Sequence, residues 1–103
     1  MAVVFSQDYY DSLKIIFQLL DTVSLTKKSR LKKTIKTKIS YVKRFTNIHQ
    51  SFSDQVKYFY ALDYVISYKI YNGNIYILKI QHGSTVINKD ETNTANLIFN
   101  KLK

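Results

Sequence analysis

The sequence has 103 residues, of which 46% are hydrophobic, and it contains neither cysteine nor proline. A chain of this length buries only about two-thirds of its unfolded surface, so we expect one domain, spanning residues 1–103, with a modest core. The absence of cysteine excludes disulfides, a thiolate nucleophile and a zinc–thiolate site.

The formal net charge of +9 is the strongest indication of function in the composition. A small domain this basic is attracted to polyanions or acidic proteins, so RNA, DNA, the ribosome and an acidic partner protein are the classes to consider. No apolar run approaches the roughly 20 residues that span a bilayer, and the first residues lack a basic region followed by an apolar core. We therefore expect a cytoplasmic protein with no membrane contact, no cofactor and no metal.

The N-terminal part of the chain predicts a strand followed by an amphipathic helix. The short apolar run Ala2–Phe5 is typical of a strand, and Ser6 follows it as an N-cap, with Asp8 in the first helical turn. Apolar residues then recur at spacings of three and four from Gln7 to about Asp21. The members of this stripe are Tyr9, Leu13, Ile16, Phe17 and Leu20.

A second helix is predicted after a break at Thr22–Thr26, where Ser24 or Thr26 would cap it. Its apolar stripe consists of Leu31, Ile35, Ile39 or Ser40, Val42 and Phe45. The same helix carries nine of the sixteen basic residues, namely Lys27, Lys28, Arg30, Lys32, Lys33, Lys36, Lys38, Lys43 and Arg44.

The charge on this second helix is not balanced locally, because no Asp or Glu occurs from Thr22 to Ser53. Like charges at spacings of four repel and weaken a helix. Either a partner compensates the charge, or the basic residues form a solvated face. For a nucleic-acid partner, the predicted contacts are Lys32, Lys36, Lys43, Arg44 and Lys57.

The middle of the chain returns from the helices to the sheet. Thr46–Asp54 is polar and predicts a connection, in which His49 stands alone and is expected to be exposed to solvent. Gln55–Tyr60 then alternates between two sides and predicts a strand, which turns at Ala61–Leu62 into the next segment.

Asp63–Gly83 predicts the hairpin around which the rest of the domain is organised. Two runs rich in β-branched and aromatic residues flank Asn72-Gly73, and both central positions of a type I′ turn need φ > 0. With Tyr71 facing Asn74, one face carries the pairs Ile70–Ile75, Tyr68–Ile77, Ile66–Lys79 and Tyr64–Gln81. The other face carries Lys69–Tyr76, Ser67–Leu78, Val65–Ile80 and Asp63–His82.

The two faces of this hairpin differ in polarity. The first is almost wholly apolar near the turn, so we expect helices to cover it. The second is mixed and is the candidate working face. At its far end Asp63 and His82 either form an acid–base pair, in which the carboxylate orients the imidazole, or a surface ion pair. Lys69 and Tyr76 either contribute to a site or form an ordinary cross-strand pair on a solvated sheet.

The last residues predict a short helix over Thr94–Lys103, after a polar connector at Lys89–Asn93. Its stripe consists of Ala95, Ile98 and Leu102, and at about ten residues it is marginal alone, so it docks or is mobile. The predicted order is a strand, a two-helix hairpin, an antiparallel three-stranded meander and a C-terminal helix. This order, β-α-α-β-β-β-α, defines an α+β fold.

Two segments carry a resemblance to a known family. The hairpin sequence YVISYKIYNGNIYILKIQHG, over Tyr64–Gly83, is similar to a YxVxY strand, a tight turn and a VxILxVxHG strand. The opening VVFSQDYYDSL is similar to a short strand that runs into a helix at a serine. Together with the element order, these segments resemble the RelE/ParE superfamily of toxins from type II toxin–antitoxin pairs. The resemblance implies a toxin domain whose partner is a small acidic antitoxin.

Members of this superfamily differ in their targets. RelE-like members cut mRNA on the ribosome with arginines, lysines and sometimes a His or Tyr on the open sheet face, whereas ParE-like members poison DNA gyrase. In this chain Val65 stands where a RelE-type arginine is usual, and Ser84, Thr85 and Val86 follow the last strand, where both branches usually have arginines. His82-Gly83 is the match that remains.

The resemblance and the predicted register together select His82 as a candidate catalytic residue, and the register adds Lys69 and Tyr76 on the same predicted face. RNA cleavage by attack of a 2′-hydroxyl needs a base, a cation for the developing charge and an acid for the leaving oxygen. His82 would transfer a proton, and Tyr76 would stack on a base or donate a hydrogen bond. Lysines near the site are Lys69 on the same predicted face, and Lys57 and Lys79 at its rim. The favoured prediction is a toxin that inhibits growth by metal-independent, ribosome-associated mRNA cleavage. The alternatives are a gyrase poison, a non-catalytic basic nucleic-acid-binding module and a toxin-like domain without activity.

Overall fold

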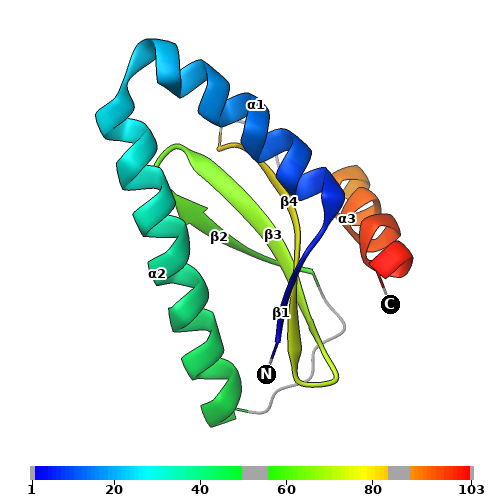
Figure 1. The fold of residues 1–103 in the computed structure, drawn as a ribbon. Helices are drawn as coiled ribbons and strands as arrows, with labels where there is room; N and C mark the ends of the chain where they lie inside the picture. Colours follow the sequence, from blue (N-terminus) through cyan, green and yellow to red (C-terminus); the bar gives the residue numbers. More distant parts are fainter. Residues whose placement is uncertain (1, 50–55, 84–88, 103) are drawn as a thin grey trace.

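The computed structural model describes residues 2–49, 56–83 and 89–102. Along the chain lie β1 (Val3–Phe5), α1 (Gln7–Val23), α2 (Leu25–His49), β2 (Lys57–Ala61), β3 (Tyr64–Tyr71), β4 (Asn74–His82) and α3 (Lys89–Leu102) (Figure 1). The strands form one sheet in the order β1-β4-β3-β2, in which β1 is parallel to β4 and the other neighbours are antiparallel. The predicted α+β fold and its element order are confirmed.

Ser6 joins β1 to α1 and to the sheet. As predicted, it caps α1: its Oγ accepts a hydrogen bond from the backbone N–H of Tyr9 at 2.9 Å. The same Oγ donates to the carbonyl of Leu78 in β4 at 2.5 Å. The backbone N–H of Ser6 donates to the carbonyl of Ile77 at 3.0 Å, which continues the pairing of β1 with β4. These bonds fix the point at which α1 leaves the sheet.

Ser24 separates the two long helices, as one of the two predicted caps. Its backbone N–H donates to the carbonyl of Leu20 at 2.7 Å and ends α1, while its Oγ accepts from the N–H of Lys27 at 3.1 Å and begins α2. The helix α2 then continues to His49, so the prediction of a connection from Thr46 was wrong over its first four residues. Because neither Gly nor Pro interrupts Thr46–His49, nothing in the sequence ends the helix there.

Some predictions for this region fall outside what the structure describes. The rest of the predicted connection and Gln55, the first residue of the predicted strand, lie outside the described residues, as do the side chains of Phe45 and His49. The strand β2 occupies Lys57–Ala61, and the turn after it is built on Leu62, whose φ is +54°. The turn predicted at Ala61–Leu62 is therefore displaced by one residue.

The β3–β4 hairpin has the predicted turn. Asn72 and Gly73 have φ values of +50° and +77°, as a type I′ turn requires. From Tyr71–Asn74 to Tyr68–Ile77, the four pairs nearest the turn have the predicted register.

A β-bulge at Leu78 changes the register beyond these pairs. Leu78 has no partner in β3, and the remaining pairs are Ser67–Lys79, Ile66–Ile80, Val65–Gln81 and Tyr64–His82. The predicted pairs Ser67–Leu78, Ile66–Lys79, Val65–Ile80, Tyr64–Gln81 and Asp63–His82 were therefore wrong. The bulge places Ile80, rather than Lys79, beneath α1 and α2. The carbonyl of Leu78 accepts a hydrogen bond from the Oγ of Ser6. Burial of a lysine without a partner would be costly, which explains the shift.

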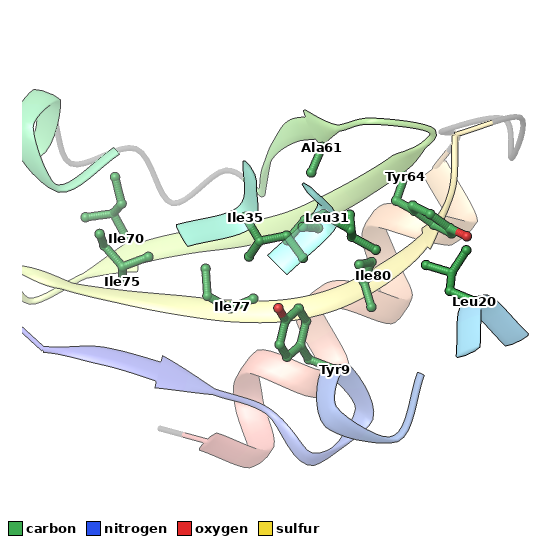
Figure 2. Packing of buried hydrophobic residues seen from close by; sticks show 11 residues of the cluster. Tyr9, Leu20, Leu31, Ile35, Ala61, Tyr64, Ile70, Ile75, Ile77 and Ile80 are labelled. Carbon is green, nitrogen blue, oxygen red and sulfur yellow. The ribbon is translucent and has the colours of Figure 1, made fainter. Parts of the chain in front are cut away.

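The main core lies between the sheet and the pair α1 and α2 (Figure 2). The apolar hairpin face is in this core, as predicted, and Ile66, Ile75 and Ile77 are at most 1% exposed. The helices contribute Tyr9 and Leu20 from α1 and Leu31 and Ile35 from α2.

The opposite face of the sheet is covered by α3, whereas we expected an open working face. Leu78 packs with Ala95, Ile98 and Phe99 in a second apolar cluster. The helix begins at Lys89, so the predicted connector Lys89–Asn93 is helical and α3 has 14 residues. This length and the buried Phe99 give α3 enough apolar surface to dock. The residues after the last strand, Ser84–Val86, lie outside the described residues.

Candidate nucleic-acid interface

Lys69 and Tyr76 pair across the hairpin as predicted, but they lie beneath α3. The ammonium of Lys69 donates to Oδ1 of Asn96 at 3.2 Å and lies 4.5 Å from the centre of the Phe99 ring. The Tyr76 and Phe99 rings meet edge to face, 5.1 Å apart. Since Lys69 is only 9% exposed, this pair is part of the packing between α3 and the sheet.

His82 lies at the other end of β4 and on the opposite face. It pairs with Tyr64, whose ring meets the imidazole edge to face at 5.8 Å. With Tyr64, Ser12 and Ile15, it lines a pocket of about 340 Å³ against α1. His82 follows Tyr76 by six positions in β4, a distance of about 20 Å along a strand.

The three predicted catalytic residues therefore do not form one cluster. The prediction that His82 shares a face with Lys69 and Tyr76 was wrong, because the bulge at Leu78 reverses the faces beyond it. A catalytic role for each of them stays a prediction.

Asp63 forms an ion pair with Lys27 at the start of α2, and in the sheet His82 lies opposite Tyr64 rather than Asp63. The hydrogen bond between the Asp63 carboxylate and the Lys27 ammonium lowers the pKa of Asp63 and raises the pKa of Lys27. The charge of His82 has a smaller effect on Asp63 than Lys27 has, and it also lowers the pKa of that carboxyl. The backbone carbonyl of Asp63 accepts a hydrogen bond from the N–H of Gly83 at 2.6 Å. Asp63 thus connects the end of the sheet to α2 and has a structural role.

The basic residues of α2 mostly face solvent. Lys27 pairs with Asp63 and Lys28 with Asp21, at 2.7 Å for the second pair. Among the described residues, no acidic side chain lies within ion-pair distance of the remaining seven. All seven are exposed, and they are Arg30, Lys32, Lys33, Lys36, Lys38, Lys43 and Arg44. This exposed set, which we call the basic face, includes four of the five predicted nucleic-acid contacts.

The fifth predicted contact, Lys57, lies on the sheet. It pairs with Tyr68 on the face toward α1 and α2, and it is half-buried. Lys57 therefore differs from the α2 residues of the basic face in being half-buried.

Three lysines of the basic face border a groove between β1, α1 and α2. The groove has a volume of about 460 Å³, and Lys32, Lys36 and Lys43 lie along its α2 side. Its lining also includes apolar side chains, among them Leu13 and Ile39. This combination of apolar and cationic residues distinguishes the groove from the pocket beside His82, which has no lysine or arginine in its lining.

Aromatic side chains form the other side of this groove. The Tyr10 ring is half-exposed and lies 5.6 Å from Phe5 and 5.7 Å from Tyr9. Tyr9 is buried beneath them, and this burial, with a smaller effect of Tyr10, raises the pKa of Tyr9 to about 12. Its hydroxyl therefore stays neutral at physiological pH.

The three lysines of the groove were predicted as nucleic-acid contacts, whereas Tyr9 was predicted only as part of the apolar stripe and Tyr10 had no predicted role. Tyr10 follows the core residue Tyr9 and lies outside the apolar stripe of α1, so periodicity alone gives it no role. Its spacing of seven from Phe17 places the two rings on one side of α1, and this was the available signal.

The described residues contain no group of three or more His, Asp or Glu side chains that could hold a metal ion. None of the helices in the described segments is both long and apolar enough to cross a membrane. In comparisons with known proteins, no family model, no curated protein and no solved structure matches this chain.

Proposed function

We propose that this protein is the toxin of a type II toxin–antitoxin pair and that it acts on translation by binding RNA through the basic face of α2. The observation that supports RNA binding is the seven exposed cations of this helix, for which the described residues supply no ion-pair partner. Such an arrangement costs helix stability, and a polyanion that released counterions would offset that cost. The toxin assignment within the proposal rests on the family resemblance.

RNA binding has more support than RNA cleavage catalysed by His82, Lys69 and Tyr76. Attack of a 2′-hydroxyl needs an acid, a base and a cation around one phosphate. Lys69 is buried against Asn96 and Phe99, and His82 lies about 20 Å from Tyr76 along β4. The family resemblance adds to the proposal that the protein cleaves mRNA on the ribosome. Measurement of mRNA integrity tests this part by itself.

The proposed partner is a small acidic antitoxin, and the proposed place of action is the cytoplasm. An acidic segment would neutralise the basic face in the same way as RNA, so the two ligands would compete. Competition would let the antitoxin control access to RNA without any conformational change.

Induction of the protein in bacterial cells tests the proposal, with growth, mRNA integrity and DNA supercoiling followed together. We expect growth to stop while supercoiling is unchanged, and the double variant Lys36→Gln/Lys43→Gln to relieve the inhibition. The variant Lys79→Gln/Lys101→Gln removes the same charge from the α3 side of the protein and should remain inhibitory.

Other outcomes of this experiment separate the alternatives. Fragmented mRNA would add cleavage to binding, whereas relaxed DNA with intact mRNA would indicate gyrase as the target. Normal growth on induction of the well-folded protein would contradict the proposal of a toxin.

A further inference from the structure

We infer that the groove between α1 and α2 binds single-stranded RNA, with unpaired bases against the aromatic residues of α1 and phosphates against the lysines of α2. The inference rests on the proposed function, because it specifies how the basic face holds its ligand. It adds to the proposed function that the ligand is a single strand rather than a duplex. It also states where the strand lies, between α1 and α2.

The groove is long enough for a polymer. The hollow of about 460 Å³ shares Tyr10 and Leu13 with a second hollow of about 450 Å³, which continues along α1 to Phe17 and Asp21. The two form one track that runs along α1. Such a track fits an extended chain better than a compact small molecule.

Aromatic rings are spaced along the α1 side of this track. Tyr10 and Phe17 are seven residues apart, which is about 10.5 Å on a helix, and Phe5 lies beside Tyr10 at 5.6 Å. The buried Tyr9 ring packs against both Phe5 and Tyr10, at 5.4 Å and 5.7 Å, and limits their movement. An exposed ring held from behind in this way provides a platform on which a base can stack.

Cations are spaced along the opposite side. Lys32, Lys36 and Lys43 lie at intervals of four and seven residues, or about 6 and 10.5 Å along α2. The ammonium groups of Lys32 and Lys28 lie 5.2 and 5.5 Å from the centre of the Phe17 ring, so the two sides meet there. Tyr10 is more exposed than Phe17. One wall therefore suits bases and the other suits phosphates, as in proteins that bind single strands without sequence preference.

The apolar part of the groove lining explains why we infer single strands and stacking. Val3, Leu13, Ile35 and Ile39 have side chains that cannot hydrogen-bond to the edges of bases, and Ser40 adds one aliphatic hydroxyl. Bases in a duplex are paired and stacked on each other, so they cannot enter. We therefore expect little sequence preference and a clear preference for strands that carry accessible bases.

Binding of fluorescent oligonucleotides, measured by anisotropy, tests this inference. The probes are a single-stranded RNA, the same strand with abasic sites, and the corresponding duplex. Tyr10→Ala should weaken binding of the intact strand by roughly tenfold, the expected loss of one stacked base, and should leave binding of the abasic strand unchanged. Tyr60→Ala, a substitution of a similarly exposed tyrosine on β2, should change neither.

Two further variants separate stacking from folding. Tyr10→Phe keeps the ring and should retain affinity, whereas Tyr10→Leu keeps apolar volume and should behave like Tyr10→Ala. Thermal unfolding of each variant shows whether the protein is folded. Equal affinity of the wild type for intact and abasic strands, or an unchanged affinity of folded Tyr10→Ala and Tyr10→Leu, would overturn the inference.

The test also distinguishes the groove from the proposed function. Salt-dependent binding whose affinity is the same for intact and abasic strands, and for the wild type and Tyr10→Ala, would overturn the inference about the groove. It would leave the proposal of RNA binding by the basic face intact. If no RNA bound but an acidic amphipathic peptide bound with dependence on Tyr10, both the inference and the RNA-binding proposal would fail. In that case the groove would be a site for a protein partner.

Discussion

The ammonium of Lys69 lies 4.5 Å from the centre of the Phe99 ring, and this contact joins the sheet to α3. A lysine at this position suggested an open polar face when only the hairpin was considered. In the folded protein the charge is covered by an aromatic ring and an amide, and the sheet has helices on both faces.

The first prediction concerns this contact. Phe99→Ala should lower the free energy of unfolding by about 3–5 kcal/mol, because Phe99 is buried against Tyr71, Tyr76 and Lys69. Lys69→Met should change it by less than about 1 kcal/mol, since a chain of similar length keeps the packing and no longer buries a charge. Denaturant unfolding of both variants gives these values. A larger loss for Lys69→Met than for Phe99→Ala would show that the charge holds α3 in place.

The second prediction tests the core face of the hairpin. Ile66→Ala and Ile77→Ala should each cost about 2–5 kcal/mol, a large part of the stability of a small domain. Ile15→Ala, at an exposed position on α1, should stay within about 0.5 kcal/mol of the wild type. An unchanged unfolding midpoint for Ile66→Ala or Ile77→Ala would mean that the two faces of the hairpin are exchanged.

The third prediction explains the glycine of the His82-Gly83 motif. A Cβ at Gly83 would lie 2.8 Å from the carbonyl oxygen of Asp63, which already accepts the Gly83 N–H. Gly83→Ala should therefore cost about 1–3 kcal/mol through this overlap. Gly73→Asn should cost less than about 1 kcal/mol, because Asn tolerates φ > 0 and no atom lies within 4 Å of a Cβ there. Comparable thermal stability of Gly83→Ala and the wild type would rule out this close approach.

The fourth prediction concerns the pH dependence of the Lys27–Asp63 pair. The pKa of Asp63 is lowered, so the pair stabilises the fold above the ordinary value of 3.8, and the contribution is lost as the pH falls through the lower folded pKa. The pKa of Lys27 is raised, so its contribution holds below 10.5 and disappears as the pH rises through the higher folded pKa. In an NMR titration, Lys27→Met should raise the pKa of Asp63 toward 3.8, and Lys33→Met should leave it low. If the pKa of Asp63 were unchanged in Lys27→Met, the ion pair between Lys27 and Asp63 would be refuted.

Local patterns predicted the elements that depend on neighbouring residues. The cap at Ser6, the turn at Asn72-Gly73 and the apolar stripe of α1 each follow from a few adjacent residues, and each is confirmed. The end of α2 was missed because polar residues alone do not stop a helix.

The predicted site failed where it depended on distant parts of the chain. Strict alternation placed Lys79 in the core, and this conflict was the only sign of the bulge at Leu78. The bond from Ser6 to Leu78, between residues 72 apart in the chain, could not be derived from local pattern. One extra residue then placed His82 on the face opposite Lys69.

The salt dependence of RNA binding tests the central proposal most directly. For single strands, the logarithm of the affinity falls against the logarithm of salt concentration with a slope of about −0.7 for each phosphate contact. We predict a steep slope for the wild type, reduced by about 1.4 in Lys36→Gln/Lys43→Gln and unchanged in Lys79→Gln/Lys101→Gln, which has the same net charge. Binding that does not respond to salt, or an equal reduction in both double variants, would contradict recognition of RNA by the basic face of α2.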